Sequence, residues 1–234
     1  MRVREVAEAL DVKVTTAYHL LNTLIAAGYI NRDSGGALRI GARAAVLYNG
    51  MLRQFRPDED LGPIAERLSA ETTETVYLCQ LTKSGVVVQK LVEGIHAVRV
   101  TGLHVGYSGL EHARASGKAV LAFMEEPDRK AMLERSTSAM TASARRTTLA
   151  ELDHEIDVIR DQGWALDEEH FQVGASCVAA PYFRSDGQVL GSIAVSAPCM
   201  RFADAKPALI AAVVSAARDA SAVLGHREAA PSQP

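Results

Sequence analysis

Residues 4–40, REVAEALDVKVTTAYHLLNTLIAAGYINRDSGGALRI, decide the fold of the first part of the chain. Apolar residues recur at helical spacing in two runs, 4–10 and 15–27, and Asp11-Val12-Lys13 between them breaks the pattern. The second run is expected to be capped at Thr15 or a neighbour and to end before Gly28, which suits the position after a helix. The two runs predict two helices joined by a tight turn.

A hairpin is expected directly after the second helix. Residues 29–32 and 37–40 flank Asp33-Ser34-Gly35-Gly36, and this composition is typical of a turn that needs positive φ angles. Helix, tight turn, helix and hairpin together form the pattern of a winged helix-turn-helix. We therefore expect residues 1–41 to be a DNA-binding domain, with the hairpin as its wing.

The second predicted helix is polar on the side opposite its apolar stripe. Short hydrogen-bonding groups, a cation and an aromatic ring are the side chains that reach base edges and phosphates from the major groove. An ordinary solvated helix face is the alternative, and the adjacent wing arginines favour DNA. The expected DNA contacts are Lys13, Thr15, Thr16, Tyr18, His19 and Asn22 from the helix and Arg32 and Arg39 from the wing.

The charge of the chain is divided unevenly. The 234 residues carry a formal net charge of −3, with 48% hydrophobic and 23% charged residues, an ordinary composition for a globular protein. Residues 1–56 hold eight basic and four acidic side chains, a net charge of +4, and the remainder carries −7. A basic head on an acidic body fits a polyanionic partner for the head alone.

The rest of the chain indicates a linker helix at 42–57 and a second domain at 58–225, followed by a disordered tail at 226–234. A chain break is expected at 56–60. Helices and strands mix without a βαβ rhythm, so the fold class is α+β. Expected helices are 61–72, 116–124, 128–135, 148–162 and 205–224, and expected strands are 75–81, 86–92, 98–104, 177–180 and 189–196.

Other chemistry is weakly supported by the sequence. Residues 115–119 lack the spacing of a phosphate loop, although free N–H groups at a helix start can bind a small carboxylate. Tight packing is the alternative role for these small residues. The Asp167-Glu168-Glu169-His170 run is more often a solvated loop than a metal or acid–base site, and Cys177 has no identifiable base. We expect no metal, no cofactor and no enzyme activity.

The cellular setting is inferred from what the sequence contains. Three widely spaced cysteines do not suggest a disulfide framework, which favours a reducing cytoplasm. We also find no continuous apolar run typical of a signal peptide or of a membrane span. No membrane partner is expected.

Three stretches resemble the IclR family of bacterial transcriptional regulators. Residues 12–24 resemble the recognition helix of the family, residues 112–122 the helix start of its ligand domain, and residues 163–181 the signature before its late strands. The resemblance extends through Gly187 and residues 192–198, and it covers nearly the whole chain in the same order.

The resemblance implies a winged helix head, a linker helix and a GAF-like effector domain. It implies homodimers or homotetramers on palindromic double-stranded operators near metabolic or catabolic genes, with a small organic acid or aromatic metabolite as effector. Such a protein is expected to be a repressor that senses a carboxylate. The positions implied for effector binding are Ala115, Ser116, Gly117, Asp167, Cys177 and Ser196.

This chain departs from the family pattern at three places. Ala194 stands where a second polar side chain is frequent, and His19 stands where arginine is usual. The family also has a helix before the one at Arg4, so the head is expected to lack its first helix and part of its apolar cover. A start upstream of Met1 or a marginal head would each account for this.

Two other functions stay open at this point. A sensor whose degenerate head mediates protein contacts, with no role in DNA binding, is the main alternative. An enzyme that uses Asp167, His170 and Cys177 is the third.

Overall fold

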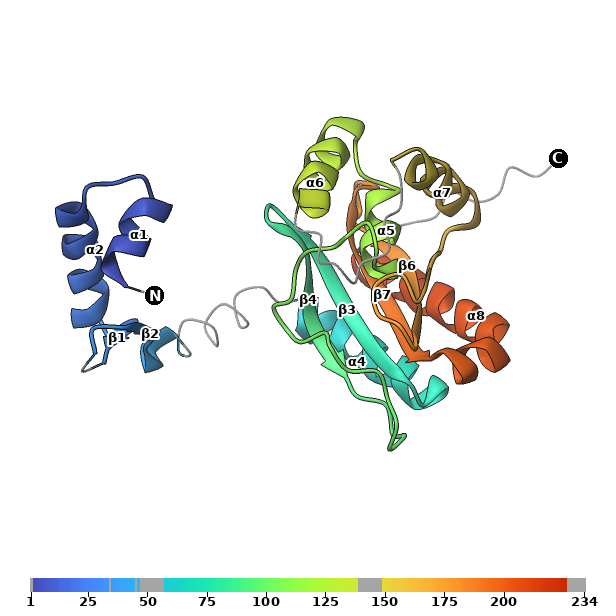
Figure 1. The fold of residues 1–234 in the computed structure, drawn as a ribbon. Coiled ribbons are helices and arrows are strands. Elements are labelled where there is room, and N and C mark those ends of the chain that lie inside the picture. The colour runs from blue at the N-terminus through green and yellow to red at the C-terminus, as the bar shows by residue number, and fades with distance from the viewer. Residues whose placement is uncertain (1, 34, 45, 47–56, 139–148, 227–234) are drawn as a thin grey trace. The chain divides into compact units, whose positions relative to one another are not determined.

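The computed structural model describes residues 2–33, 35–44, 46, 57–138 and 149–226 (Figure 1). Contacts within the chain divide it into two compact units, residues 1–56 and 57–234. The boundary lies at the end of the predicted linker. Each unit is described by itself below.

The first unit has the predicted helix, turn, helix and hairpin. Helices α1 (Val3–Ala9) and α2 (Val14–Ala26) are followed by strands β1 (Ile30–Arg32) and β2 (Leu38–Ile40), which pair antiparallel. Gly28 and Gly36 have positive φ angles of 76° and 80°. Asp33 accepts hydrogen bonds from the backbone N–H groups of Gly35 and Ala37 and so fixes the wing turn.

Part of the apolar stripe of α2 has no cover within the described residues. Ala17 and Leu21 are buried with Val3 and Ala7, whereas Leu20 is 51% exposed and Leu24 40% exposed. These exposed side chains line an apolar groove of about 630 Å³ that also includes Leu10 and Ile40. The expectation of incomplete apolar cover in the head is confirmed.

The linker and the tail lie mostly outside the described residues. Residues 42–44 and 46 are helical, and 47–56 and 227–234 are not described, so the linker helix and the disordered tail stay predictions. The expected break at 56–60 is wrong for its last four residues. Helix α4 (Pro57–Thr72) begins at Pro57, a residue that is favoured at the first helical position because it needs no N–H partner there.

The second unit is built on one antiparallel sheet. Its strands are β3 (Thr75–Thr82), β4 (Gly85–Val92), β5 (Ala165–Glu168), β6 (Ala175–Phe183) and β7 (Val189–Pro198). The spatial order is β4-β3-β7-β6-β5, and each neighbouring pair runs antiparallel. The α+β class is confirmed.

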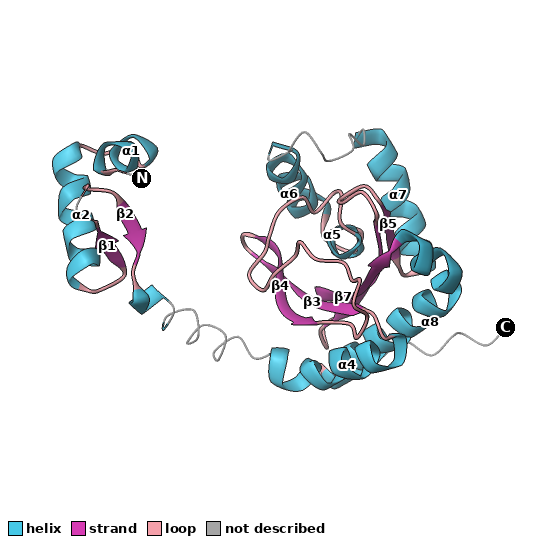
Figure 2. Ribbon diagram, turned by 60° about the horizontal axis from the view of Figure 1, so that its bottom comes forward, coloured by secondary structure: helices cyan, strands magenta, loops and turns pink. Residues whose placement is uncertain are grey.

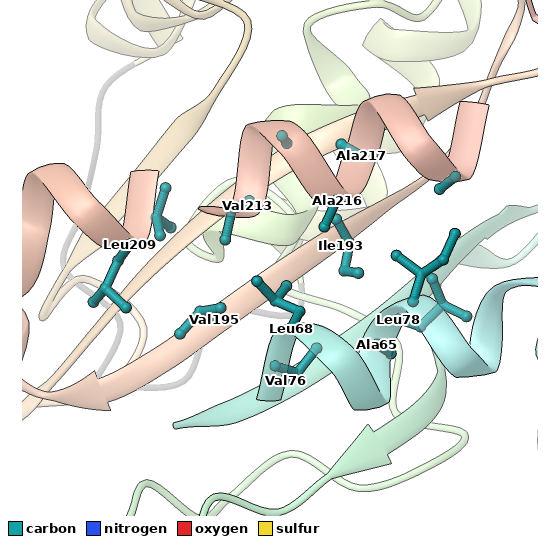
Figure 3. Close-up of a cluster of buried hydrophobic side chains, with 14 of the residues drawn as sticks. Ala65, Leu68, Val76, Leu78, Ile193, Val195, Leu209, Val213, Ala216 and Ala217 are labelled. Atoms are coloured by element: carbon teal, nitrogen blue, oxygen red, sulfur yellow. The ribbon is translucent and has the colours of Figure 1, made fainter. Parts of the chain in front are cut away.

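Helices cover both faces of the sheet (Figures 1 and 2). Helices α4 and α8 (Cys199–Val223) pack on one face, and α5 (Ala115–Leu121), α6 (Glu126–Ser138) and α7 (Leu149–Gln162) pack on the other. Because successive strand residues point to opposite faces, Val76 and Leu78 meet α4 and α8 while Tyr77 and Cys79 meet α5. Figure 3 shows Leu68 of α4 beside Val195 of β7 in the first of these two layers.

Two expectations for the second unit are wrong. Residues 98–104 do not form a strand, and Gly102 has a φ of 128°, which breaks an extended ladder. Asp167 does not lie in a solvated loop but in β5, where its side chain is buried. The segment at 98–104 instead forms part of a cavity wall.

Candidate functional site

The residues predicted to contact DNA are all exposed on the first unit. Lys13 is the N-cap residue of α2, and the helix presents Thr15, Thr16, Tyr18, His19 and Asn22 to solvent. The guanidinium of Arg32 lies over the Tyr18 ring, 5.5 Å from its centroid. This contact brings a wing cation against the predicted recognition helix.

The two wing arginines point to opposite faces of the hairpin. Arg32 pairs with Leu38 and Asn31 pairs with Arg39 in the strand register, so Arg32 and Arg39 alternate between faces. The Nε of Arg39 lies 3.6 Å from a carboxylate oxygen of Asp33. Of the two, only Arg32 contacts Tyr18, and the face that it forms with α2 is the stronger candidate for DNA.

The second unit contains a small cavity where the start of α5 meets four strands. It holds about 20 Å³, which is room for about one water molecule. Polar groups converge on it from α5, from β5, β6 and β7, and from Gln172 and Thr101 in the loops. The lining residues are Tyr77, Val100, Thr101, Leu103, Arg114, Ala115, Ser116, Asp167, Phe171, Gln172, Ala175, Ser176, Cys177 and Ser196.

The structure brings most of the predicted effector residues together. Ala115, Ser116, Asp167, Cys177 and Ser196 all line the cavity although they lie up to 81 residues apart in sequence. Gly117 does not line it. A Cβ at Gly117 would lie closer than 3.0 Å to backbone atoms of Glu111, so this glycine allows close packing of the helix against the preceding loop.

Arg114 is the charged cavity residue that the sequence did not reveal. It is 2% exposed and is the N-cap residue of α5. Its Nε donates to the Gly109 carbonyl at 2.8 Å and its Nη2 to the Val86 carbonyl at 2.9 Å. Its Nη1 approaches the Ser116 hydroxyl at 3.4 Å. A lone arginine in a small-residue motif carries no spacing signal, which is why it was missed.

The charge of Arg114 is partly balanced inside the protein. A carboxylate oxygen of Glu111 lies 3.6 Å from Arg114 Nη2, and both side chains are buried. The same oxygen accepts hydrogen bonds from the N–H groups of Val86 and Gly109. The guanidinium also lies 5.1 Å from the centroid of the Tyr107 ring. These contacts hold a cation at the cavity wall in fixed orientation.

Asp167 provides a negative group to the same cavity. One of its carboxylate oxygens accepts hydrogen bonds from the backbone N–H groups of His170 and Phe171. Burial raises the pKa of Asp167, and these backbone hydrogen bonds partly oppose that rise. The cavity thus offers a cation in Arg114 and a hydrogen-bond acceptor in Asp167.

The arrangement does not favour nucleophilic catalysis by Cys177. Burial, and secondarily the charge of Asp167, raises the pKa of the Cys177 thiol well above its usual range. A reactive cysteine needs the opposite shift, because the thiolate is the nucleophile. His170 donates to Asp167 from its backbone N–H, so this hydrogen bond does not involve the imidazole ring that an acid–base role would use.

Two other kinds of structure are absent from the described residues. No group of three or more histidine, cysteine, aspartate or glutamate side chains there is placed to hold a metal ion. Within the same residues, no helix has the length and apolarity needed to cross a membrane.

Two protein families match the chain in separate parts. Residues 58–222 match the family described as bacterial transcriptional regulator IclR C-terminal, and residues 1–34 match the IclR helix-turn-helix domain. Among solved structures, the IclR of Thermotoga maritima is similar with a TM-score of 0.71 and 25% identity, covering 97% of this chain and 92% of that one. An IclR family transcriptional regulator of Brucella abortus shares the fold, with a TM-score of 0.79, 18% identity and coverage of 96% and 85%.

Curated relatives carry regulator names. The HTH-type transcriptional regulator BhcR of Paracoccus denitrificans is 32% identical over 97% of this chain and 82% of its own length. The transcriptional repressor IclR of Escherichia coli is 25% identical over 94% of this chain and 82% of its own length. The two family matches and these relatives show that the chain belongs to the IclR family of bacterial transcriptional regulators.

Proposed function

We propose that this regulator is a repressor that binds a palindromic operator and releases or tightens on it when a small carboxylate enters the cavity. The observation that carries the proposal is the pairing, in one chain, of a basic helix-turn-helix face with a unit that holds a buried arginine at a cavity wall. A regulator of this kind works beside its DNA, in the cytoplasm.

The DNA side of the proposal rests on the head. The eight exposed side chains Lys13, Thr15, Thr16, Tyr18, His19, Asn22, Arg32 and Arg39 carry hydrogen-bonding and cationic groups on a unit of net charge +4. A single head covers one half-site, so homodimers or homotetramers are needed to read a palindrome. Relatives named as an acetate operon repressor and a glycerol operon regulatory protein support control of metabolic genes.

The effector part of the proposal rests on the polar side chains that line the cavity, Arg114 and Ser116 on the one hand and Asp167 on the other. A carboxylate fits near Arg114 and Ser116, where a guanidinium and a hydroxyl can donate hydrogen bonds. A hydroxyl or N–H group on the same molecule can donate to Asp167. Ala115, Cys177 and Ser196 then complete the walls. The effector class is therefore a small carboxylic acid that also carries a hydrogen-bond donor.

The DNA proposal is tested by titrating the full chain with its own upstream region at several salt concentrations. Log affinity is expected to fall linearly with log salt, at about 0.9 per phosphate neutralised. A triple variant, Thr15→Ala, Thr16→Ala and Asn22→Ala, should lose discrimination from unrelated DNA while keeping most of the salt dependence. Binding without salt dependence would exclude this mode of recognition.

The effector proposal is tested by calorimetry with 2-hydroxybutyrate and with butyrate as probes. Arg114→Met is expected to abolish binding of both acids, and Asp167→Ala is expected to weaken the hydroxy acid selectively. Ser116→Asp should also abolish binding, because a second anion would face the first. Unchanged affinity in Arg114→Met and Ser116→Asp would refute the site.

A second function is favoured by one observation, the exposed apolar groove of about 630 Å³ on the head. In this alternative the head contacts another protein and the second unit still senses a small molecule. Substituting Leu20 and Leu24 with serine distinguishes the two, since the DNA-contact face lies elsewhere on α2. DNA binding that survives the substitution supports the regulator, and absence of DNA binding in the unaltered chain supports the alternative.

A further inference from the structure

One wall of the cavity is a single loop, which we call the cover segment, residues 94–109. Three of its side chains, Val100, Thr101 and Leu103, line the cavity together with residues of β5 and β6. Gly102 approaches the Gln172 side chain so closely that a Cβ at Gly102 would lie 2.8 Å from the amide oxygen of Gln172. With space for about one water molecule inside, a larger molecule requires the lining to move, and this loop, together with residues 171–172, is the part of the lining that lies outside the sheet and α5.

Backbone hydrogen bonds hold the cover segment at both ends. At the start, the Ile95 N–H donates to the Thr73 carbonyl at 3.1 Å. Near the end, the Gly106 N–H donates to the Val88 carbonyl at 2.8 Å, and the Val88 N–H donates to the Tyr107 carbonyl at 2.9 Å. These bonds hold one end of the loop at Thr73, just before β3, and the other end on β4, so movement is confined to the residues between them.

Between these two ends, the side chain of Arg201 on α8 contacts the loop. Arg201 Nη2 donates to the Val98 carbonyl at 2.9 Å. The same guanidinium donates from Nε and Nη2 to the two carboxylate oxygens of Glu74, at 2.6 and 2.9 Å. Glu74 has a side chain only 7% exposed, so the fork that orients Arg201 is anchored in the body of the unit.

Arg201 lies outside the cavity and does not touch its interior. We propose that Arg201 is the positioning residue of the effector cavity: held by Glu74, it pins Val98 and keeps the cover segment closed. This inference rests on the proposed function in taking the cavity as the effector site. Entry and exit of an effector then require the bond from Arg201 to Val98 to open.

Cys177 is partly exposed and lines the same cavity as Val100, Thr101 and Leu103 of the cover segment, so a change in its alkylation rate reports opening without any effector. The full chain is treated with iodoacetamide at pH 8, and the alkylation rate of Cys177 is read by peptide mass mapping. Arg201→Met is expected to raise that rate about tenfold, which corresponds to ~1.4 kcal/mol easier opening. Hydrogen exchange at residues 98–103 should accelerate in parallel.

Lys206→Met provides the matched control. Lys206 lies on the same helix, has the same side-chain exposure of 34% as Arg201, and donates at 2.6 Å to Glu168, not to the cover segment. In Lys206→Met, the alkylation rate of Cys177 should equal that in the unaltered chain. Arg201→Lys, which keeps the charge but loses the planar fork, should fall between the two.

Equal Cys177 rates in Arg201→Met and Lys206→Met would overturn the proposal. If Arg201→Met does not fold, Glu74→Gln replaces it: faster alkylation with an unchanged unfolding temperature supports the role, and an unchanged rate refutes it. Because no effector is added, these outcomes are independent of whether the cavity binds a carboxylate. If Arg201→Met speeds Cys177 alkylation as expected but neither acid binds in the calorimeter, the proposed ligand class is refuted and the role of Arg201 is not.

Discussion

Asp167 lies directly opposite Cys177 where β5 pairs with β6, and both side chains line the same cavity. A carboxylate facing a thiol disfavours the thiolate, and burial has the same effect more strongly. The pair therefore keeps the cavity free of a reactive sulfur anion while leaving an acceptor for a ligand.

Replacing Asp167 with asparagine should make Cys177 more reactive. Removing the neighbouring negative charge lowers the pKa of the thiol, so more thiolate is present at a given pH. The alkylation rate of Cys177 at pH 8 is expected to rise several-fold, by less than the full effect of burial. The pH profile of labelling measures this, and a profile identical to that of the unaltered chain would contradict it.

The same substitution should change how stability depends on pH. Because the folded-state pKa of Asp167 is raised, the folded unit keeps that proton to a higher pH than the unfolded chain does. The stability that Asp167 contributes is complete below its unfolded pKa of about 3.9 and is lost as the pH rises through the folded pKa. The melting temperature of Asp167→Asn, minus that of the unaltered chain, should therefore increase from pH 4 to pH 7.

Calorimetric melts of the second unit at the two pH values measure this gain. Asp204→Asn, an exposed carboxylate on α8, is the control. A difference between Asp167→Asn and the unaltered chain that stays constant with pH would mean that the carboxylate is not protonated preferentially in the fold.

The two wing arginines should contribute unequally to DNA binding. Arg32 lies over Tyr18, whereas Arg39 is on the opposite face of the hairpin beside Asp33. Arg32→Ala is expected to reduce the slope of log affinity against log salt by about 0.9, the value for one lost phosphate contact. Arg39→Ala is expected to change it less. Equal slopes for the two variants would show that the face shared with α2 is not the one that meets DNA.

Adjacent leucines of α2 should differ in their effect on the stability of the head. Leu21 is buried against α1, and Leu20 is half exposed in the groove. Leu21→Ala should cost about 2–5 kcal/mol and Leu20→Ala well under 1 kcal/mol. Urea unfolding followed by circular dichroism of the full chain, at the transition of the head, measures both. A comparable loss for Leu20→Ala would indicate that the groove is covered in solution.

Gly117 should not tolerate a methyl group. Because an added Cβ would meet the backbone of Glu111, which cannot swing away, Gly117→Ala should destabilise the second unit by about 1–3 kcal/mol, the range of an overpacked core. Gly35→Ala in the wing turn, where the nearest atom is an ordinary contact at 3.5 Å, is the matched control. Thermal unfolding of each unit gives the comparison.

Local patterns were sufficient to predict the head and the main layers of the second unit. The spacing of Ala17 and Leu21 gave the buried side of α2, and the turn residues around Gly36 gave the hairpin. These features depend on neighbours in sequence. The same is true of the strand hairpin at 75–92.

The features that were missed depend on residues far apart in sequence. Arg114 is buried because Val86 and Gly109 supply carbonyls to it, and neither partner is visible from its own motif. Residues 98–104 alternate like a strand. The free edge of β4, however, is hydrogen-bonded at Val88 to Gly106 and Tyr107, and not to this segment. Asp167 looked solvated because its acidic neighbours are, while the strand pairing that buries it begins at Ala165.

Because α8 is long, a small movement at Arg201, near its first residue, is a larger movement near its last residue. The helix has 25 residues and is therefore about 37 Å long, with Arg201 in its first turn and Asp219 near its end, where Asp219 is paired with Arg67 of α4. A rotation of about 5° about the Arg201 end would displace the far end by about 3 Å. The helix contains Pro207, a residue at which helices bend, so the displacement that reaches the Arg67–Asp219 pair on α4 is at most of this size, which is the length of a hydrogen bond.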